Sequence, residues 1–179
     1  MNDDDDPVAL HLRGDHDGAA RALRRRFGAL VHGVMLAHAP LKAVEELTEE
    51  TLDWAGVKLG SLREPGALPA WLAMSARRRA IDARRRQAAS AAPLDDRPEP
   101  ADRRSEGRAA ATVEADEAIE AVRTLPEAYR ETLILRLVEG LSGPEIAEKT
   151  GLTPGSVRVN LHRGLTLLRA KLEGAPAHD

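Results

Sequence analysis

The side chains best suited to chemistry on a ligand lie on one face of a helix expected near the C-terminus. Apolar residues recur there every three or four positions from Val157 to Leu172, so they form the inner side of a helix with about 3.6 residues per turn. Arginine binds guanine edges with paired hydrogen bonds, and serine, asparagine and histidine suit phosphates or base edges. The opposite face therefore predicts contact with duplex DNA, and the alternative is a solvated face on an ordinary helical hairpin. The outward and flanking residues are Ser156, Arg158, Val159, Asn160, His162 and Arg163.

The segment before this helix contains the local signals of a helix-turn-helix. Ser142 and Glu145 are spaced as a capping box for a short helix, in which each side chain accepts a hydrogen bond from the other's backbone N–H. Gly151 stands where the turn needs a left-handed backbone, and Thr153 followed by Pro154 supplies an N-cap and a first helical residue. The stretch "LPEAYRETLILRLVEGLSGPEIAEKTGLTPGSVRVNLHRGLTLLRAKL" therefore predicts a helix, a short second helix, a turn and a recognition helix.

Two charged segments of opposite sign lie in the first half of the chain. The segment "LKAVEELTEETLDWA" predicts a helix with an acidic outer side, which is either a solvated face or a docking surface for a basic partner. The segment "AWLAMSARRRAIDARRRQ" holds two arginine clusters, residues 77–79 and 84–86. We expect these clusters to face solvent or a nucleic-acid backbone, and the alternative is a basic helix end that complements its own dipole. The acidic residues are Glu45, Glu46, Glu49 and Glu50.

Composition indicates a helical protein without disulfides. The 179 residues carry a formal net charge of −3 and include no cysteine, which excludes disulfides, thiolate metal sites and a cysteine nucleophile. Segments rich in Ala, Leu, Arg and Glu, with only two Trp, one Tyr and one Phe, predict an all-α fold. No apolar run reaches membrane-spanning length and no signal peptide is visible, so we expect a soluble, cytoplasmic protein.

A change in composition divides the chain into two expected helical domains. Residues 89–115 are rich in alanine, proline and charge, which is typical of a flexible linker because such a segment buries little surface. We therefore expect one domain at residues 12–88 and another at residues 116–174. The first eleven residues and the last five are expected to be frayed.

The order of these elements resembles that of the extracytoplasmic-function (group IV) sigma factors, which belong to the sigma-70 family of bacterial RNA polymerase. The resemblance covers about residues 18–173 and is strongest over "LPEAYRETLILRLVEGLSGPEIAEKTGLTPGSVRVNLHR". Earlier in the chain, "AVEELTEETL" is similar to the family's acidic helix and "WLAMSARRRAIDARRR" to its tryptophan-containing promoter helix. The resemblance implies a sigma domain two at residues 12–88 and a sigma domain four at residues 116–174, joined by the linker.

The resemblance also implies partners for each element. In the family, the acidic helix docks on the clamp helices of the largest polymerase subunit, domain four contacts the flap of the second subunit, and an anti-sigma factor is a further partner. Residues 60–70 match the loop that captures a flipped base of the minus-ten element, and the recognition helix matches the one that reads the minus-thirty-five element. The implied polymerase contacts are Glu45, Glu46, Leu47, Glu49, Glu50 and Leu52, and the implied minus-ten contacts are Arg77, Arg78, Asp82 and Arg85.

The function expected from the resemblance is promoter-specific initiation of transcription together with core polymerase. We expect no enzyme activity, cofactor or metal, since the histidines at positions 11, 16, 32 and 38 show no metal-ligand spacing with carboxylates. Two alternatives stay open. One is a sigma-like adaptor that binds an anti-sigma factor without initiating transcription, and the other is a helix-turn-helix repressor with a helical effector domain.

Overall fold

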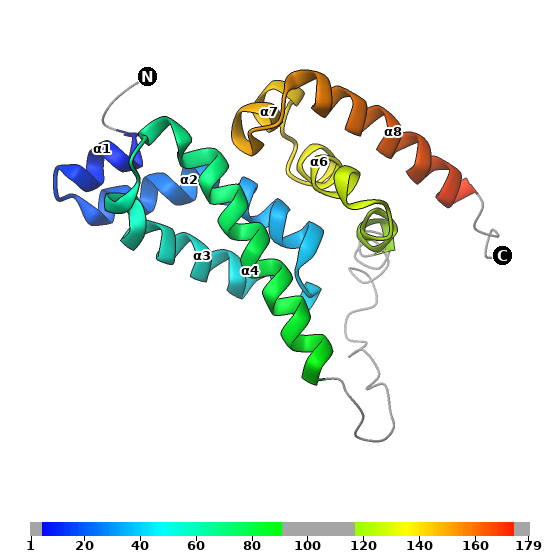
Figure 1. Cartoon of the computed structure of the whole chain (residues 1–179), viewed down its shortest axis with the longest axis horizontal. Helices are drawn as coiled ribbons and strands as arrows, with labels where there is room; N and C mark the ends of the chain where they lie inside the picture. The colour runs from blue at the N-terminus through cyan, green and yellow to red at the C-terminus, as the bar shows by residue number, and fades with distance from the viewer. Residues whose placement is uncertain (1–4, 91–116, 174–179) are drawn as a thin grey trace, which may run out of the picture.

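The computed structural model describes residues 5–90 and 117–173, and all regular structure in these ranges is helical (Figure 1). The first lobe, residues 5–90, contains α1 (Pro7–Leu12), α2 (His16–His38), α3 (Val44–Lys58) and α4 (Leu68–Ser90). The second lobe, residues 117–173, contains α6 (Glu127–Leu137), α7 (Gly143–Thr150) and α8 (Pro154–Glu173), and its residues 117–123 are also helical. The prediction of an all-α fold is confirmed, while the predicted linker lies outside the described residues from residue 91 onward.

Helix α2 is the centre of the first lobe and packs against α1, α3 and α4. It begins where the Asp15 carboxylate accepts a hydrogen bond of 2.8 Å from the Gly18 N–H, and it ends before Pro40, which cannot continue a helix. Seven of its apolar side chains are at most 4% exposed, so this helix contributes a large part of the lobe's core. They are Ala22, Leu23, Phe27, Leu30, Val31, Val34 and Met35.

The N-terminal segment is ordered where fraying was expected. The Asp6 carboxylate caps α1 by accepting a hydrogen bond of 2.9 Å from the Val8 N–H. Val8 and Leu10 are only 3% and 9% exposed, because α1 lays its apolar side against α2. The expectation of fraying is therefore wrong for residues 7–11, since two buried anchors and a cap hold this short helix in place.

Helices α3 and α4 meet through a pair of tryptophans. Trp54 and Trp71 stack with their ring centroids 5.2 Å apart, and the Arg79 guanidinium lies 4.9 Å from the Trp54 centroid. Ala76 and Ala80 of α4 are fully buried, and such small side chains allow helices to approach closely. Because the alanine side of α4 is buried, the arginines of this helix lie on its opposite side.

In the second lobe, α6 forms the core and α8 crosses it at a glycine. A β-carbon placed on Gly164 would lie 2.8 Å from Leu133 Cδ1 and 3.1 Å from Tyr129 Cβ, so only glycine permits this close approach. The predicted inner stripe of α8 is correct from Val157 to Leu168, which are 1% and 9% exposed. It is wrong for Leu172, which is 52% exposed because the last turn of α8 extends beyond the helices it packs on (Figure 1).

The two lobes also pack against each other. Helix α2 contacts α6, and α4 contacts α7, so residues far apart in the sequence share one interface. Within the described ranges, no helix combines the length and the apolar character that crossing a membrane requires.

Candidate nucleic-acid and partner interfaces

The helix-turn-helix is built by the local signals that the sequence contains. The Ser142 N–H donates to Glu145 Oε2 at 2.8 Å and the Glu145 N–H to Ser142 Oγ at 3.4 Å, so the predicted capping box is confirmed. Gly151 has φ of 76°, the left-handed conformation predicted for the turn. Thr153 Oγ1 accepts a hydrogen bond of 3.1 Å from the Ser156 N–H and thereby caps α8.

The recognition face of α8 is turned to solvent. Ser156, Arg158, His162 and Arg163 are exposed, Val159 is 45% exposed, and Asn160 is half-buried. The opposite side is anchored by Val157, which packs into the core of the lobe. The predicted orientation of this face is therefore confirmed, and its contact with DNA stays a prediction.

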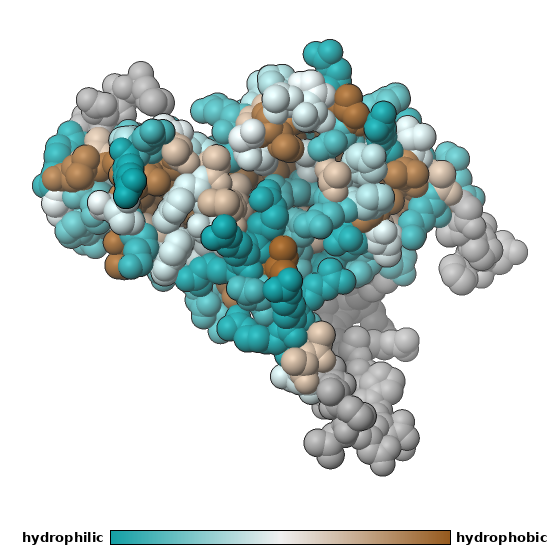
Figure 2. All heavy atoms as spheres, in the orientation of Figure 1, coloured by the Kyte–Doolittle hydropathy of each residue, from teal (hydrophilic) through white to brown (hydrophobic). Residues whose placement is uncertain are grey.

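The outer side of α4 presents most, but not all, of its arginines. Arg78, Asp82 and Arg85 are exposed, and Figure 2 shows a hydrophilic surface along this helix. Arg77 was expected to face solvent, but its side chain is only 33% exposed. Its guanidinium donates to both carboxylate oxygens of Glu131 in α6, at 3.0 and 2.7 Å, because the second lobe packs over this part of α4.

Glu131 is a buried acid shared by two basic groups of the first lobe. It is 7% exposed, and its Oε2 also accepts a hydrogen bond of 3.0 Å from His38 Nε2, at the end of α2. Burial alone would raise the pKa of Glu131, but the hydrogen bonds from His38 and Arg77 outweigh it and hold that pKa below its usual value. The carboxylate therefore stays ionised inside the interface and ties the lobes together.

The acidic outer side of α3 is exposed as predicted, although two of its members have partners within the first lobe. Glu49 accepts a hydrogen bond of 3.1 Å from Arg24 Nε, and Glu45 lies 3.4 Å from His32 Nε2. Glu46 and Glu50 point outward next to a shallow pocket of about 440 Å³. These two residues are thus the most available members of the predicted docking surface.

Two of the residues implied as polymerase contacts are on the wrong side of α3. Leu47 and Leu52 are 7% and 2% exposed, since the 3.6-residue period places them against the core of the first lobe. In this arrangement neither side chain is exposed to a partner, which corrects the expectation for these two residues.

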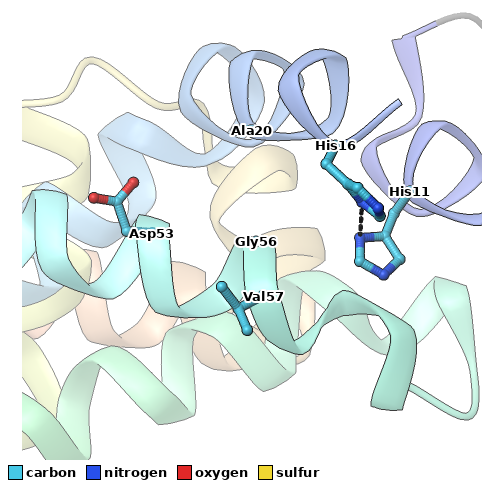
Figure 3. Close-up of a pocket in the computed structure, with 6 residues that line it drawn as sticks. All are labelled: His11, His16, Ala20, Asp53, Gly56 and Val57. Atoms are coloured by element: carbon cyan, nitrogen blue, oxygen red, sulfur yellow. Dashed lines mark hydrogen bonds between the residues drawn. The ribbon is translucent and has the colours of Figure 1, made fainter. Parts of the chain in front are cut away.

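A further pocket of about 380 Å³ lies between α1, α2 and α3 (Figure 3). At its edge, His11 Nδ1 and His16 Nδ1 are 3.3 Å apart, a pairing across the turn between α1 and α2 that the sequence analysis missed. Asp53 also lines the pocket, but it points away from the two imidazoles and binds Arg24. Across residues 5–90 and 117–173, no three side chains of metal-ligating type come together.

Two cations of the second lobe, Arg123 and Lys149, bind backbone carbonyl oxygens of the first lobe and were not predicted from the sequence. Arg123 donates hydrogen bonds of 2.7 Å to the carbonyl oxygens of both Leu36 and Ala39, at the C-terminal end of that helix. Lys149 donates to the Arg26 carbonyl oxygen at 2.8 Å, and its ammonium lies 4.8 Å from the Phe27 ring centroid. Neither contact has a local sequence signal, because each joins residues more than 80 positions apart.

Two helical lobes with an exposed recognition helix define a helix-turn-helix protein, and comparison with known proteins identifies its family. Residues 115–168 match the family model described as "Sigma-70, region 4". The RNA polymerase sigma factor SigV of Bacillus subtilis is 32% identical over 127 residues, which are 71% of this chain and 74% of SigV. The chain belongs to the sigma-70 family of RNA polymerase sigma factors.

Other relatives match shorter stretches. The extracytoplasmic-function sigma factor ShbA of Streptomyces griseus is 40% identical over 93 residues, 51% of this chain and 49% of ShbA. SigD of Mycobacterium tuberculosis is 46% identical over 56 residues, 31% of this chain and 26% of SigD. The chain thus aligns with only about half of ShbA and a quarter of SigD. The fold is similar to that of CnrH, solved in complex with the cytosolic domain of CnrY, with a TM-score of 0.65, 24% identity and coverage of 96% of this chain and 98% of CnrH.

Proposed function

We propose that this protein is an alternative sigma factor, which binds core RNA polymerase and directs promoter-specific initiation of transcription in the cytoplasm. The observation that carries the proposal is the capped helix-turn-helix, whose recognition helix turns its polar face outward and its apolar face into the core. Family membership adds weight, and so does the exposed acidic side of α3, which suits a basic docking partner.

The proposed reader of the minus-thirty-five element is α8. Arg158 and Arg163 supply contacts to bases or phosphates, while Ser156 and Asn160 suit phosphates. Val159 has no hydrogen-bonding side chain, so it is suited to the methyl group of a thymine. His162 completes the face.

The proposed reader of the minus-ten element is α4 with the preceding residues 60–70. Arg78, Asp82 and Arg85 are exposed on this helix and can meet DNA in the arrangement described. Arg77 can join them only after its ion pair with Glu131 opens. Promoter binding by Arg77 therefore requires the lobes to separate.

The proposed polymerase contact is the acidic side of α3, with Glu46 and Glu50 at its centre and Glu45 and Glu49 beside them. On this proposal, the acidic side of α3 binds the clamp helices of the largest polymerase subunit. Domain four binds the flap of the second subunit. The similarity in fold to CnrH, which has been solved with the cytosolic domain of CnrY bound, supports a protein partner here too, and we propose an anti-sigma factor.

Reconstituted transcription separates this proposal from the two alternatives. Core polymerase, the full chain and a library of promoters should give transcripts with defined start sites. An adaptor would bind its partner protein and give no transcript. A repressor would bind specific DNA without polymerase and reduce transcription by another sigma factor. Either of these last two results would contradict the proposal.

A further inference from the structure

At the interface between the lobes, His32 links α2, α3 and the turn that follows α6. His32, on α2, places Nδ1 2.5 Å from Glu139 Oε1 of the second lobe and Nε2 3.4 Å from Glu45 Oε1 on α3. Both imidazole nitrogens thus face carboxylates, and the side chains of His32 and Glu139 are only 28% and 12% exposed. An imidazole with an acid at each nitrogen binds both of them best when it carries two protons.

We propose that the two lobes are joined by a proton-dependent latch in which protonated His32 holds Glu139 and keeps the lobes closed, while neutral His32 lets them separate. The other polar ties that the structure describes across the interface join Arg77 and His38 to Glu131, and Arg123 and Lys149 to backbone carbonyl oxygens. Among these groups, His32 faces a carboxylate at each of its two nitrogens, so we assign to it the response of closure to a change of one or two pH units.

The direction of the effect follows from what His32 faces in each state. The hydrogen bond with Glu139 raises the pKa of His32 above its usual value, against the opposing effect of partial burial. When the lobes separate, Glu139 leaves and only Glu45 stays on the first lobe. Closure therefore takes up a proton. The contribution of His32 to the stability of the closed form is fully present below the pKa of His32 in the open form, and it is lost as pH rises through the raised pKa of His32 in the closed form.

His38 is the other histidine at this interface, and its surroundings differ. It faces a single carboxylate, that of Glu131, which already has Arg77 as a counterion. His32 meets two carboxylates, so it is the residue to which the geometry assigns the titration.

The latch has a consequence that rests on the proposed function. Glu45 belongs to the acidic side of α3, so a basic partner that draws Glu45 away removes one of the two charges that keep His32 protonated. The same event then loosens the lobes and frees Arg77 from Glu131. The latch itself does not depend on this consequence, because closure is measured on the free protein.

The test is a distance measurement between the lobes as a function of pH. The chain has no cysteine, so Val57→Cys with Arg169→Cys gives one dye on an exposed position of each lobe. Single-molecule energy transfer should show the ratio of closed to open molecules falling by about threefold or more between about pH 6 and pH 8.5, since each unit of raised pKa multiplies that ratio by up to about tenfold.

Variants decide which group is responsible. His32→Gln retains a hydrogen-bonding side chain that does not titrate, so the closed-to-open ratio should become independent of pH in this range, and Glu139→Gln should flatten it as well. His16→Gln, at the exposed start of α2, should behave like the parent chain. The helical circular dichroism signal of each variant verifies its fold. If His32→Gln does not fold, Glu139→Gln takes its place as the variant that tests the latch. A constant ratio in the parent chain, an unchanged slope in His32→Gln, or a slope lost only in His38→Gln would overturn the latch.

Discussion

Arg77 of α4 and Glu131 of α6 form a bidentate ion pair, with hydrogen bonds of 3.0 and 2.7 Å, across the interface between the lobes. The hydrogen bond to Glu131 raises the pKa of the Arg77 guanidinium, and Glu131 is 7% exposed. The residue that the sequence assigns to promoter DNA is thus bound to an acid of the same chain. In the closed arrangement, Nε and Nη2 of Arg77 are occupied by Glu131 and are not available to a DNA phosphate.

Glu131→Gln should weaken closure. It leaves the partly buried Arg77 guanidinium without its hydrogen-bonded counterion, which costs roughly 1–3 kcal/mol for a charged group that loses its partner. Energy transfer between labels on the two lobes should show more open molecules at neutral pH. Glu173→Gln, at the exposed end of α8, removes the same charge and should change nothing. An equal fraction of open molecules in both variants would show that the pair contributes nothing to closure.

Acid should open the same contact. The pKa of Glu131 is lowered in the closed form. Its contribution to the stability of the closed form is therefore present above its pKa in the open form, about 4.3 for a glutamate, and is lost as pH falls through its lower pKa in the closed form. Lobe separation measured from about pH 5 to pH 3 should therefore show an opening step in the parent chain that is absent in Glu131→Gln. Circular dichroism recorded in parallel separates opening of the lobes from unfolding of the helices.

Glu46→Lys with Glu50→Lys should weaken binding to core polymerase and leave the fold intact. Both side chains are exposed, and surface substitutions usually change the free energy of unfolding by about 0.5 kcal/mol or less each. They are preferable to Glu45 and Glu49, which interact with His32 and Arg24. The measurement is co-purification with core polymerase.

The matched control for this pair is Glu148→Lys with Glu173→Lys, which makes the same change of charge on exposed positions of the second lobe. If both double variants bind core polymerase equally well, the acidic side of α3 is only a solvated surface.

Arg163→Ala should relax the sequence preference of α8 at one base position. Loss of a bidentate contact to guanine costs about 1–3 kcal/mol. Loss of a phosphate contact instead weakens binding to all sequences alike and lowers the slope of log affinity against log salt concentration by about one. Selection from a randomised upstream element, with core polymerase and the full chain, distinguishes these results. Arg169→Ala, exposed further along α8, is the control. Identical base preferences in wild type and Arg163→Ala would assign specificity to Arg158 or to DNA shape.

Gly164→Ala should destabilise the second lobe. The added β-carbon would meet Leu133 Cδ1 at 2.8 Å and Tyr129 Cβ at 3.1 Å, and such overpacking costs about 1–3 kcal/mol. Gly155→Ala is a control in the first turn of the same helix, where the nearest atom is 3.9 Å away, and it should be neutral or slightly stabilising. Urea unfolding of the two variants gives the comparison. Equal midpoints would mean that α6 and α8 shift apart without cost.

Much of the second lobe could be predicted because its signals are local. The capping box of Ser142 and Glu145, the left-handed Gly151 and the Thr153 cap each act within a few residues, so they are legible in the sequence. The same holds for the exposed side of α3, where helical period alone separates Glu46 and Glu50 from the buried Leu47. In these segments the sequence by itself determined which residues turn outward.

The tertiary structure decided what the two lobes do to each other. The contacts of Arg77 with Glu131 and of His32 with Glu139 join positions 54 and 107 residues apart. Their formation depends on packing α2 and α4 against α6 and α7, which no local pattern encodes. Helical period predicted that Arg77 lies on the outer side of α4, but whether that side meets solvent, DNA or a carboxylate of the same chain depends on the placement of a distant lobe. A charged side chain binds whatever counterion the assembled surface brings within reach, and that is fixed only when the lobes meet.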